Sequence, residues 1–276
     1  MALCGERNFP VLYNMFLQSP NDVNTAPKRI ISLVPSITEL LHHLGLEEET
    51  VGITKFCIHP DEWFRSKARI GGTKTIHLEK VKELQPDLII ASKEENIKEQ
   101  VEALAKEHPV WLTDVNNLED ALEMIIHTGK LTGRLPAAEK LVEQINEQFL
   151  AIQPLAAKNG KLRTAYLIWK DPYMAAGTNT YINSMLRFAG FTNAFAHLTR
   201  YPEVSIEAMK ASECQLVLLS SEPYPFSQKH INELQLQLPG VKILLVDGEI
   251  FSWYGNHLLK APSYFEKLSD SLVNSE

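Results

Sequence analysis

LEKVKELQPDLIIASKE, residues 78–94, decides the fold because a second stretch repeats its pattern. The second stretch is IEAMKASECQLVLLSSE, residues 206–222, and the two align without a gap. Most apolar positions agree, and both copies carry an acidic second residue and an acidic last residue. Apolar residues at helical spacing, then a turn, then a continuous apolar run predict a helix followed by a buried strand. The repeat therefore predicts two similar α/β units.

The segments before each copy also share one order of elements. The run IISLV, residues 30–34, predicts a buried strand, and a helix over 37–44 follows it and ends at Gly45. Ser36 and Glu39 form a capping-box pattern at the start of that helix. In the second half, a strand over 164–169 leads to a helix over 181–189. Alternating strands and helices predict parallel sheets with helices on both faces.

Between the two halves lies RLPAAEKLVEQINEQFLAIQP, which predicts one amphipathic helix over 136–154. Proline at the start fits a first helical turn, and Pro154 prevents continuation. The apolar face consists of Ala138, Leu141, Val142, Ile145, Phe149 and Ile152. We expect this face to pack on both halves, so that open and closed forms differ little.

The predicted fold class is therefore α/β, with two Rossmann-like lobes of parallel sheet joined by a single long backbone helix and a ligand cleft between the lobes. The expected divisions are an N-terminal extension (1–27), an N-terminal lobe (28–134), the connecting helix (135–154) and a C-terminal lobe (155–276).

Charge and cysteine content exclude several classes of function. The 276 residues carry a net charge of −7, which argues against a nucleic-acid partner. Three cysteines, Cys4, Cys57 and Cys214, lie far apart and predict neither a disulfide framework nor a Cys-x-x-Cys metal site. Residues 1–20 lack a signal-peptide pattern, since charged residues follow the start at once. This leaves a cytoplasmic location open as an alternative.

Ligands of open α/β sheets bind beyond the carboxyl ends of the strands. The loops expected there are rich in aromatic residues, which suit a flat, bulky, amphipathic ligand, although any one of them could equally fill a core. The expected ligand-binding residues are Pro35, Ser36, Phe56, Cys57, Trp63, Lys74, Trp169, Tyr173, Tyr224, Phe226, Trp253 and Tyr254.

Cys57 and His59 are the only metal-ligand candidates in these loops, and two such groups do not make a zinc site. A thiolate beside a histidine is also the basis of papain-type catalysis, but a Cys-x-His pair does not supply that geometry. We therefore predict no enzyme, no catalytic residues and no catalytic cofactor. A cytosolic enzyme or sensor that uses Cys57 and His59 remains the alternative from another class.

Four segments resemble a known family: ISLVPSITELLHHLGL (31–46), VGITKFCIHP (51–60), GGTK (71–74) and LEKVKELQPDLII (78–90). They are similar to the substrate-binding proteins of ABC importers that carry cobalamin or iron complexes. Within the helical-backbone metal receptor group, the cobalamin-receptor branch is the most similar. The resemblance covers about residues 28–265.

This resemblance implies a monomeric receptor in the periplasm or cell envelope that holds a metal chelate between its lobes: cobalamin, haem or a ferric siderophore. It also implies delivery to an ABC permease that docks on one glutamate of each lobe, here Glu79 and Glu207. An anionic siderophore would need several arginines in the cleft. Only Arg65, Arg69 and Arg200 are plausible there, which favours a corrinoid.

Overall fold

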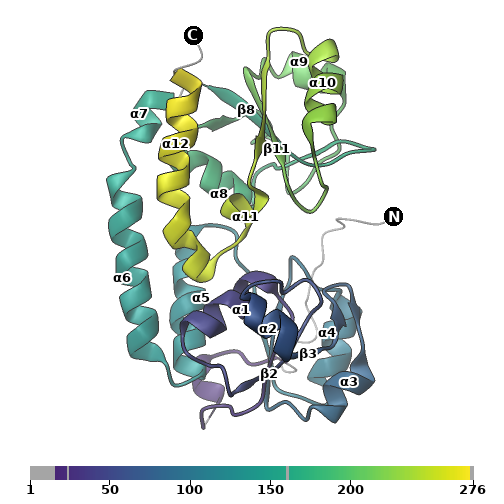
Figure 1. Ribbon diagram of the computed structural model, residues 1–276, viewed down its shortest axis with the longest axis vertical. Coiled ribbons are helices and arrows are strands. Elements are labelled where there is room, and N and C mark those ends of the chain that lie inside the picture. The colour runs from purple at the N-terminus through teal and green to yellow at the C-terminus, as the bar shows by residue number, and fades with distance from the viewer. Residues whose placement is uncertain (1–15, 24, 160–161, 274–276) are drawn as a thin grey trace.

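The computed structural model describes residues 16–23, 25–159 and 162–273, which form two α/β lobes beside one long helix (Figure 1). The N-terminal lobe has a parallel sheet in the order β3-β2-β1-β6-β7. Its central strands pair in register, with Ile30 opposite Leu88 and Ile31 opposite Ile89. The bounds of its strands are β1 Ile30–Ser32, β2 Thr50–Ile53, β3 Ala68–Arg69, β6 Leu88–Ser92 and β7 Val110–Thr113, with a small antiparallel pair β4 Gly71–Gly72 and β5 Thr75–Ile76.

The helices of this lobe connect its strands as the periodicity predicts. Their bounds are α1 Pro35–His43, α2 Asp61–Ser66, α3 Leu78–Glu83, α4 Lys98–Ala105 and α5 Leu118–Leu131. The predicted capping box at Ser36 is wrong. Helix α1 begins at Pro35, and its N-cap, Val34, makes no side-chain capping bond. Pro35 fits the first turn because it lacks an N–H, so the helix starts earlier and Glu39 points elsewhere.

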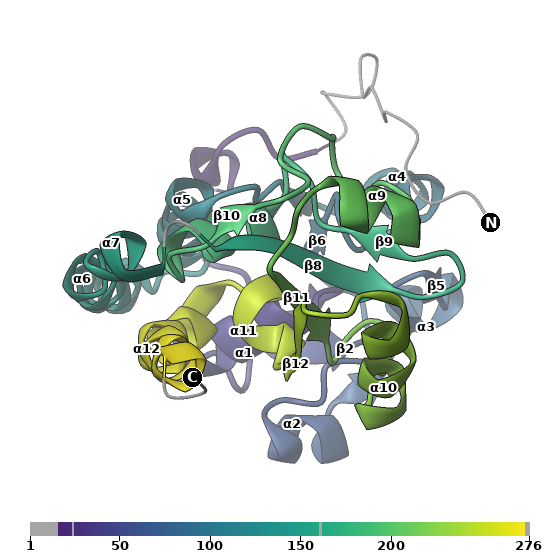
Figure 2. The same ribbon diagram turned by 90° about the horizontal axis from the view of Figure 1, so that it is seen from above.

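The C-terminal lobe has strands in the order β10-β8-β11-β12, and β9 pairs antiparallel with β8. Figure 2 shows α9 on one side of this sheet and α11 and α12 on the other. Helix α8 shares the apolar cluster of α11 and α12, whereas α9 and α10 pack on the opposite face of the sheet. The bounds of its strands are β8 Arg163–Trp169, β9 Met174–Ala175, β10 Thr192–Asn193, β11 Leu216–Ser220 and β12 Lys242–Val246. Its helices are α7 Leu155–Asn159, α8 Tyr181–Phe188, α9 Ile206–Ala211, α10 Gln228–Gln237, α11 Gly248–Ser252, the 3-10 helix η3 Gly255–Lys260 and α12 Ala261–Val273.

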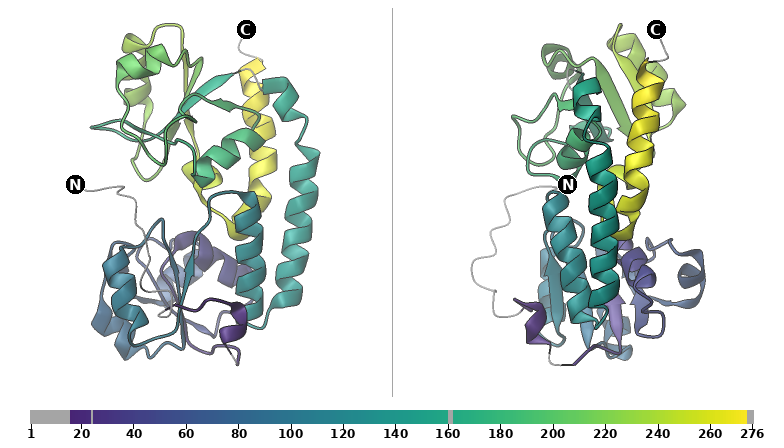
Figure 3. Two further views of the ribbon diagram at one scale, coloured as in Figure 1. Left: turned by 180° about the vertical axis from the view of Figure 1, so that it is seen from behind. Right: turned by 90° about the vertical axis from the view of Figure 1, so that its left-hand side faces the viewer.

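Helix α6, Leu135–Ala151, joins the lobes and runs along both of them (Figure 3). It buries Ala138, Leu141, Ile145 and Phe149. On the N-terminal side it packs tightly against α5, where a Cβ at Gly129 would come within 2.4 Å of the Ala138 Cβ. On the C-terminal side, the Phe149 ring meets Phe188 of α8 edge-on at 5.0 Å. The apolar face therefore contacts both lobes, as expected.

A second connection crosses the lobes, so α6 is not the sole link. Helix η3 of the C-terminal lobe packs on α1 of the N-terminal lobe. Gly255, at φ +90°, begins η3, and a Cβ there would lie 3.2 Å from the Leu40 Cβ. This close approach makes the two halves share one continuous apolar core, to which the C-terminal lobe adds a second cluster around β8 and β11.

Part of the predicted N-terminal extension packs on the first lobe. The 3-10 helix η2, Pro20–Asp22, contacts α5, and the Leu17 N–H donates to the Val110 carbonyl at 3.0 Å. Phe16, Leu17 and Val23 pack against the core. Residues 1–15, with Cys4 and most of the segment tested for a signal peptide, lie outside the described residues. Within the described part of the chain, no helix has the length and apolar character needed to cross a bilayer.

Candidate ligand-binding interface

Loops from the carboxyl ends of strands in both lobes meet at the lobe interface. One contact centres on Arg200, in the segment after β10. Its guanidinium pairs with Glu94, which follows β6 in the other lobe, and donates to Asn116 Oδ1 at 3.2 Å and to the Asn179 carbonyl at 3.0 Å. Arg200 is one of the three arginines that the sequence placed at the cleft, and it forms an ion pair with a carboxylate of the protein.

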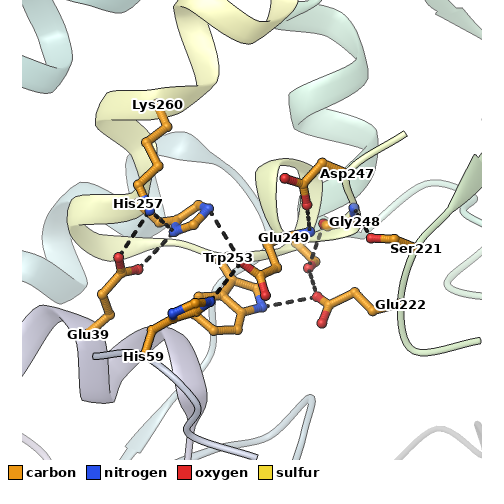
Figure 4. A network of polar contacts seen from close by, with 11 residues as sticks. Glu39, His59, Ser221, Glu222, Asp247, Gly248, Glu249, Trp253, His257 and Lys260 are labelled. Carbon is orange, nitrogen blue, oxygen red and sulfur yellow. Dashed lines mark hydrogen bonds and ion pairs between the residues drawn. The ribbon is translucent and has the colours of Figure 1, made fainter. Parts of the chain in front are cut away.

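A second contact joins α1 to the segment after β12 (Figure 4). Glu39 of α1 accepts from Lys260 Nζ at 3.2 Å, and its other oxygen lies 2.8 Å from His257 Nδ1. Burial alone would raise the pKa of Glu39, but His257 and Lys260 outweigh it and hold this pKa below its usual value. Glu39 is therefore an ionised, nearly buried anchor between the lobes.

Glu249 extends this network toward the solvent. Its carboxylate lies 4.0 Å from His257 Nε2 and 3.7 Å from Nε2 of His59, which belongs to the loop after β2. The His59 ring also meets Trp253 edge-on, with centroids 5.8 Å apart. Histidines and carboxylates from both lobes thus alternate across the interface (Figure 4).

Glu222 follows β11 and is held in one orientation. Its Oε1 accepts from Ser252 Oγ at 2.7 Å and from Trp253 Nε1 at 3.0 Å. The loop and α11 approach closely, because a Cβ at Gly248 would fall 2.6 Å from the Glu222 Cγ. Burial and repulsion from Glu249 raise the pKa of Glu222, although the bond from Ser252 opposes them.

Glu95 lies beside Glu94 at the end of β6 and is partly buried. Burial, followed by repulsion from Glu222 and Glu94, raises its pKa to about 8, while Lys74 acts in the opposite direction. Glu222 of the other lobe is thus one of the groups that raise the pKa of Glu95 across the interface.

Several predicted aromatic residues come together in the C-terminal lobe. The Trp169 ring meets Tyr224 at 5.5 Å, and Tyr224 meets Phe226 at 4.7 Å. Tyr173 packs beside the same apolar cluster. Trp169, Tyr173 and Tyr224 keep part of their surface exposed, whereas Phe226 is buried. The partly exposed rings are those available to a ligand.

Other predicted residues lie inside the protein. Trp63 is fully buried and meets His42 edge-on at 5.2 Å, so it belongs to the core of its lobe rather than to a cleft wall. Pro35 and Ser36 are buried in the first turn of α1. Tyr254 is buried against Tyr181, with ring centroids 5.7 Å apart. The aromatic pattern missed this because core and surface rings follow strands equally well.

The N-terminal lobe offers a smaller exposed surface at the interface. Phe56 is 51% exposed, and Lys55 Nζ lies 5.1 Å from the centroid of its ring. A Cβ at Gly72 would approach the Phe56 ring to 3.0 Å, so a glycine lets the ring lie on the backbone of the β4–β5 turn. Lys74 in that turn is exposed. Phe56 and Lys74 are thus both accessible from solvent.

Cys57 does not have the surroundings of a nucleophile. It is fully buried, accepts from Thr38 Oγ1 at 3.0 Å, and lies 3.2 Å from Thr54 Oγ1. Burial raises the pKa of its thiol to about 11, which keeps it protonated at neutral pH. His59 pairs with Glu249 instead. In the part of the chain that the structure describes, no three His, Cys, Asp or Glu side chains are grouped to hold a metal ion.

A cavity of about 540 Å³ also opens between the lobes, beside the end of α6. Asn116, Asn117 and Glu119 line it from the first lobe. The lining residues of the second lobe are Thr178, Asn179, Thr180, Asn183, Ser184, Arg187 and Phe188. None of the residues that the sequence assigned to ligand binding lines this cavity.

The two predicted docking glutamates occupy matching positions. Glu79 is the second residue of α3 and Glu207 the second residue of α9, and both are exposed. Figure 1 shows α3 and α9 in different lobes, both on the side away from α6. A bond from its own backbone N–H and one from Ser205 lower the pKa of Glu207. Both carboxylates can therefore meet a partner at the surface.

Sequence reasoning missed the contacts that join the lobes. It assigned Glu39 to a capping box and gave no role to Glu249 or His257, because the His257–Glu39 contact spans 218 positions of the chain. Glu94 and Glu222 did leave a signal, since the internal repeat aligns one with the other. The repeat could therefore have indicated that both carboxyl groups lie at equivalent strand ends.

Comparison with known proteins agrees with this architecture. The family model described as periplasmic binding protein matches residues 30–240. A vitamin B12-binding protein from Vibrio parahaemolyticus is 24% identical over 208 residues, which cover 75% of each chain. The crystal structure of a periplasmic vitamin B12-binding protein of Vibrio cholerae matches with a TM-score of 0.77 at 20% identity, over 91% of this chain and 99% of that one.

A periplasmic haem-binding protein from Pseudomonas aeruginosa has nearly the same fold, with a TM-score of 0.76 at 21% identity over 90% of this chain and 94% of that one. At such identities the structures establish the fold, and the family match establishes the class. The chain belongs to the periplasmic binding protein family, whose members are non-enzymatic substrate-binding components of ABC transporters.

Proposed function

We propose that this protein captures a corrinoid such as cobalamin between its lobes and delivers it to an ABC import permease. The observation that carries the proposal is the family match over residues 30–240, together with similarity to vitamin B12-binding proteins. Haem and ferric siderophores are the alternative ligands. The similarity to a haem-binding structure is the reason to compare haem binding with cobalamin binding. The compartment consistent with this role is the periplasm or cell envelope, and the expected form is a monomer.

The three arginines expected near the cleft support a corrinoid over an anionic siderophore. Arg65 pairs with Asp61 at 2.7 Å, and Arg69 donates to the Phe64 carbonyl. Arg200 pairs with Glu94. All three arginines that the sequence placed near the cleft are thus engaged by protein groups, whereas carboxylate or catecholate ligands need guanidinium partners. A large amphipathic corrinoid can instead use the exposed parts of Phe56, Trp169 and Tyr224.

The proposed docking surface rests on Glu79 and Glu207. Their matching places on α3 and α9, one in each lobe, suit a permease with two similar subunits. Their positions in the first helical turn also favour a negative charge for local reasons, because the helix dipole contributes ~0.3–1 kcal/mol there. The local and docking roles are compatible.

The test is direct titration of the purified protein. Cyanocobalamin, haemin and a ferric hydroxamate would be titrated separately, with calorimetry and visible absorption as readouts. We expect saturable one-to-one binding of cyanocobalamin with the highest affinity. Tighter binding of haemin would mean that haem, rather than a corrinoid, is the ligand. Absence of binding to all three would overturn the proposal of a chelate receptor.

A further inference from the structure

Each lobe brings one incompletely paired carboxyl group to the interface. Glu222 follows β11, and Glu95 follows Glu94, which is the repeat equivalent of Glu222 at the end of β6. The loops that follow these equivalent strand ends thus each carry a carboxyl group at the lobe interface. This arrangement bears on which chelate the interface accepts.

The Glu222 carboxylate is held in place through one of its oxygens, while the other oxygen is left without a hydrogen bond from the described residues. Both hydrogen bonds to its side chain, from Ser252 and Trp253, end on Oε1. Among the described residues no hydrogen bond reaches Oε2. A carboxylate oxygen accepts two hydrogen bonds, so Oε2 retains capacity for a ligand donor. Because Trp253 is buried and holds the other oxygen, the free oxygen is already oriented.

Glu95 contrasts with its neighbour Glu94. Arg200 takes up the charge of Glu94, whereas no ion pair or side-chain hydrogen bond of Glu95 occurs within the described ranges. The charged and titratable groups that interact electrostatically with Glu95 are Glu94, Glu222, Lys74, Cys57 and Tyr254. Those that face Glu222 are Glu95, Glu249, Asp247 and Tyr166. Acidic groups dominate both sets.

We infer that this interface selects metal chelates whose edges carry hydrogen-bond donors, such as primary amides, and discriminates against chelates whose edges carry carboxylates, with Glu95 and Glu222 as the selecting side chains. The inference rests on the proposed function, because it concerns the ligand of the same site. An amide N–H satisfies the open acceptor of Glu222, and a carboxylate placed there meets like charge.

The protonation state of Glu95 makes the selection depend on pH. Its pKa of about 8 leaves the group largely as a carboxylic acid at pH 7. A carboxylic acid donates one hydrogen bond and accepts others, so it can pair with both the carbonyl and the N–H of a primary amide. Above pH 8 the ionised form still accepts from the amide but repels a carboxylate more strongly, so discrimination should increase with pH.

The experiment compares two nearly identical ligands. Cyanocobalamin and a cobalamin monocarboxylic acid, in which one side-chain amide is hydrolysed, would be titrated at pH 7.0 and 8.5. We expect the wild type to prefer the amide by about tenfold, the equivalent of about 1.4 kcal/mol. The preference should be larger at pH 8.5. In Glu222→Gln and Glu95→Gln it should fall to about threefold or less.

Glu266→Gln is the matched control, because it removes an exposed carboxylate from the middle of α12, outside the loops that carry Glu95 and Glu222. It should keep the wild-type preference. Glutamine at 222 retains an acceptor for Ser252 and Trp253, and circular dichroism would verify folding. Equal binding of the two ligands, or unchanged preference in both interface variants, would overturn the selection while leaving the receptor function intact. Failure of every chelate to bind would overturn both.

Discussion

The two lobes repeat one backbone plan but treat equivalent side chains differently. Glu94 and Glu222 occupy the same place after β6 and β11, yet Arg200 of the opposite lobe neutralises the first, and Trp253 and Ser252 of its own lobe hold the second. Two tryptophans outside the aligned repeat also differ between the lobes, in their burial. Trp63 of the first lobe is buried, whereas Trp169 of the second is partly exposed. The repeated fold therefore places side chains at equivalent positions, and the packing around each position determines its partners and its exposure.

The largest expected loss of stability tests the difference in burial between Trp63 and Trp169. Trp63→Ala should destabilise the protein by about 3–5 kcal/mol, because it leaves a cavity in a fully buried site. Trp169→Ala should cost only about 1 kcal/mol but weaken ligand binding. Urea unfolding and calorimetric titration of both variants would measure this. Equal losses of stability would mean that Trp169 is a core residue as well.

The next effect concerns the contact between the lobes. His257→Ala removes a partner of Glu39 and leaves a nearly buried carboxylate with only Lys260, at a cost of about 1–3 kcal/mol. Lys260→Ala should cost less, because Lys260 is exposed. Unfolding curves of both variants at pH 7 would rank them. A larger loss for Lys260→Ala would contradict the assignment of His257 as the main partner.

Glu39 and Glu95 should respond to pH with opposite signs. The folded pKa of Glu39 is lowered, so its stabilisation is present above its usual value of 4.5 and is lost as pH falls through the folded pKa. The folded pKa of Glu95 is raised, so ionisation destabilises the fold increasingly between pH 4.5 and about 8. Glu95→Gln should therefore gain stability over the wild type as pH rises across that range.

The matching variant Glu39→Gln should be less stable than the wild type at pH 7, and this difference should shrink as pH falls below 4.5. Thermal unfolding of both variants from pH 3 to 9 would measure the two trends. A stability difference for Glu95→Gln that does not vary with pH would contradict the raised pKa of Glu95.

The smallest effect on the isolated protein is expected for the docking glutamates. Glu79→Lys and Glu207→Lys lie on exposed helix starts, so stability should change by about 0.5 kcal/mol or less. Ligand affinity should stay unchanged, while transport by a reconstituted permease should fall in each variant and fall further in the double variant. Full transport by the double variant would contradict the proposed docking surface.

The sequence by itself determined the α/β lobes, their order and the connecting helix. Apolar periodicity is a local property, so residues 78–94 and 206–222 predicted their own helices and strands. It also indicated which loops follow the strands, and therefore where Trp169, Glu94 and Glu222 lie. Local patterns placed the capping box of α1 wrongly, because Pro35 fits the first turn without a side-chain cap.

Tertiary structure decided which of these residues face solvent and which charges pair. Trp63 and Trp169 look alike in sequence, but only the packing around each ring buries one and exposes part of the other. Glu39 meets His257 across 218 positions of the chain, a contact that no local pattern records. Burial and electrostatic pairing depend on distances in space, and these exist only once both lobes have packed against each other.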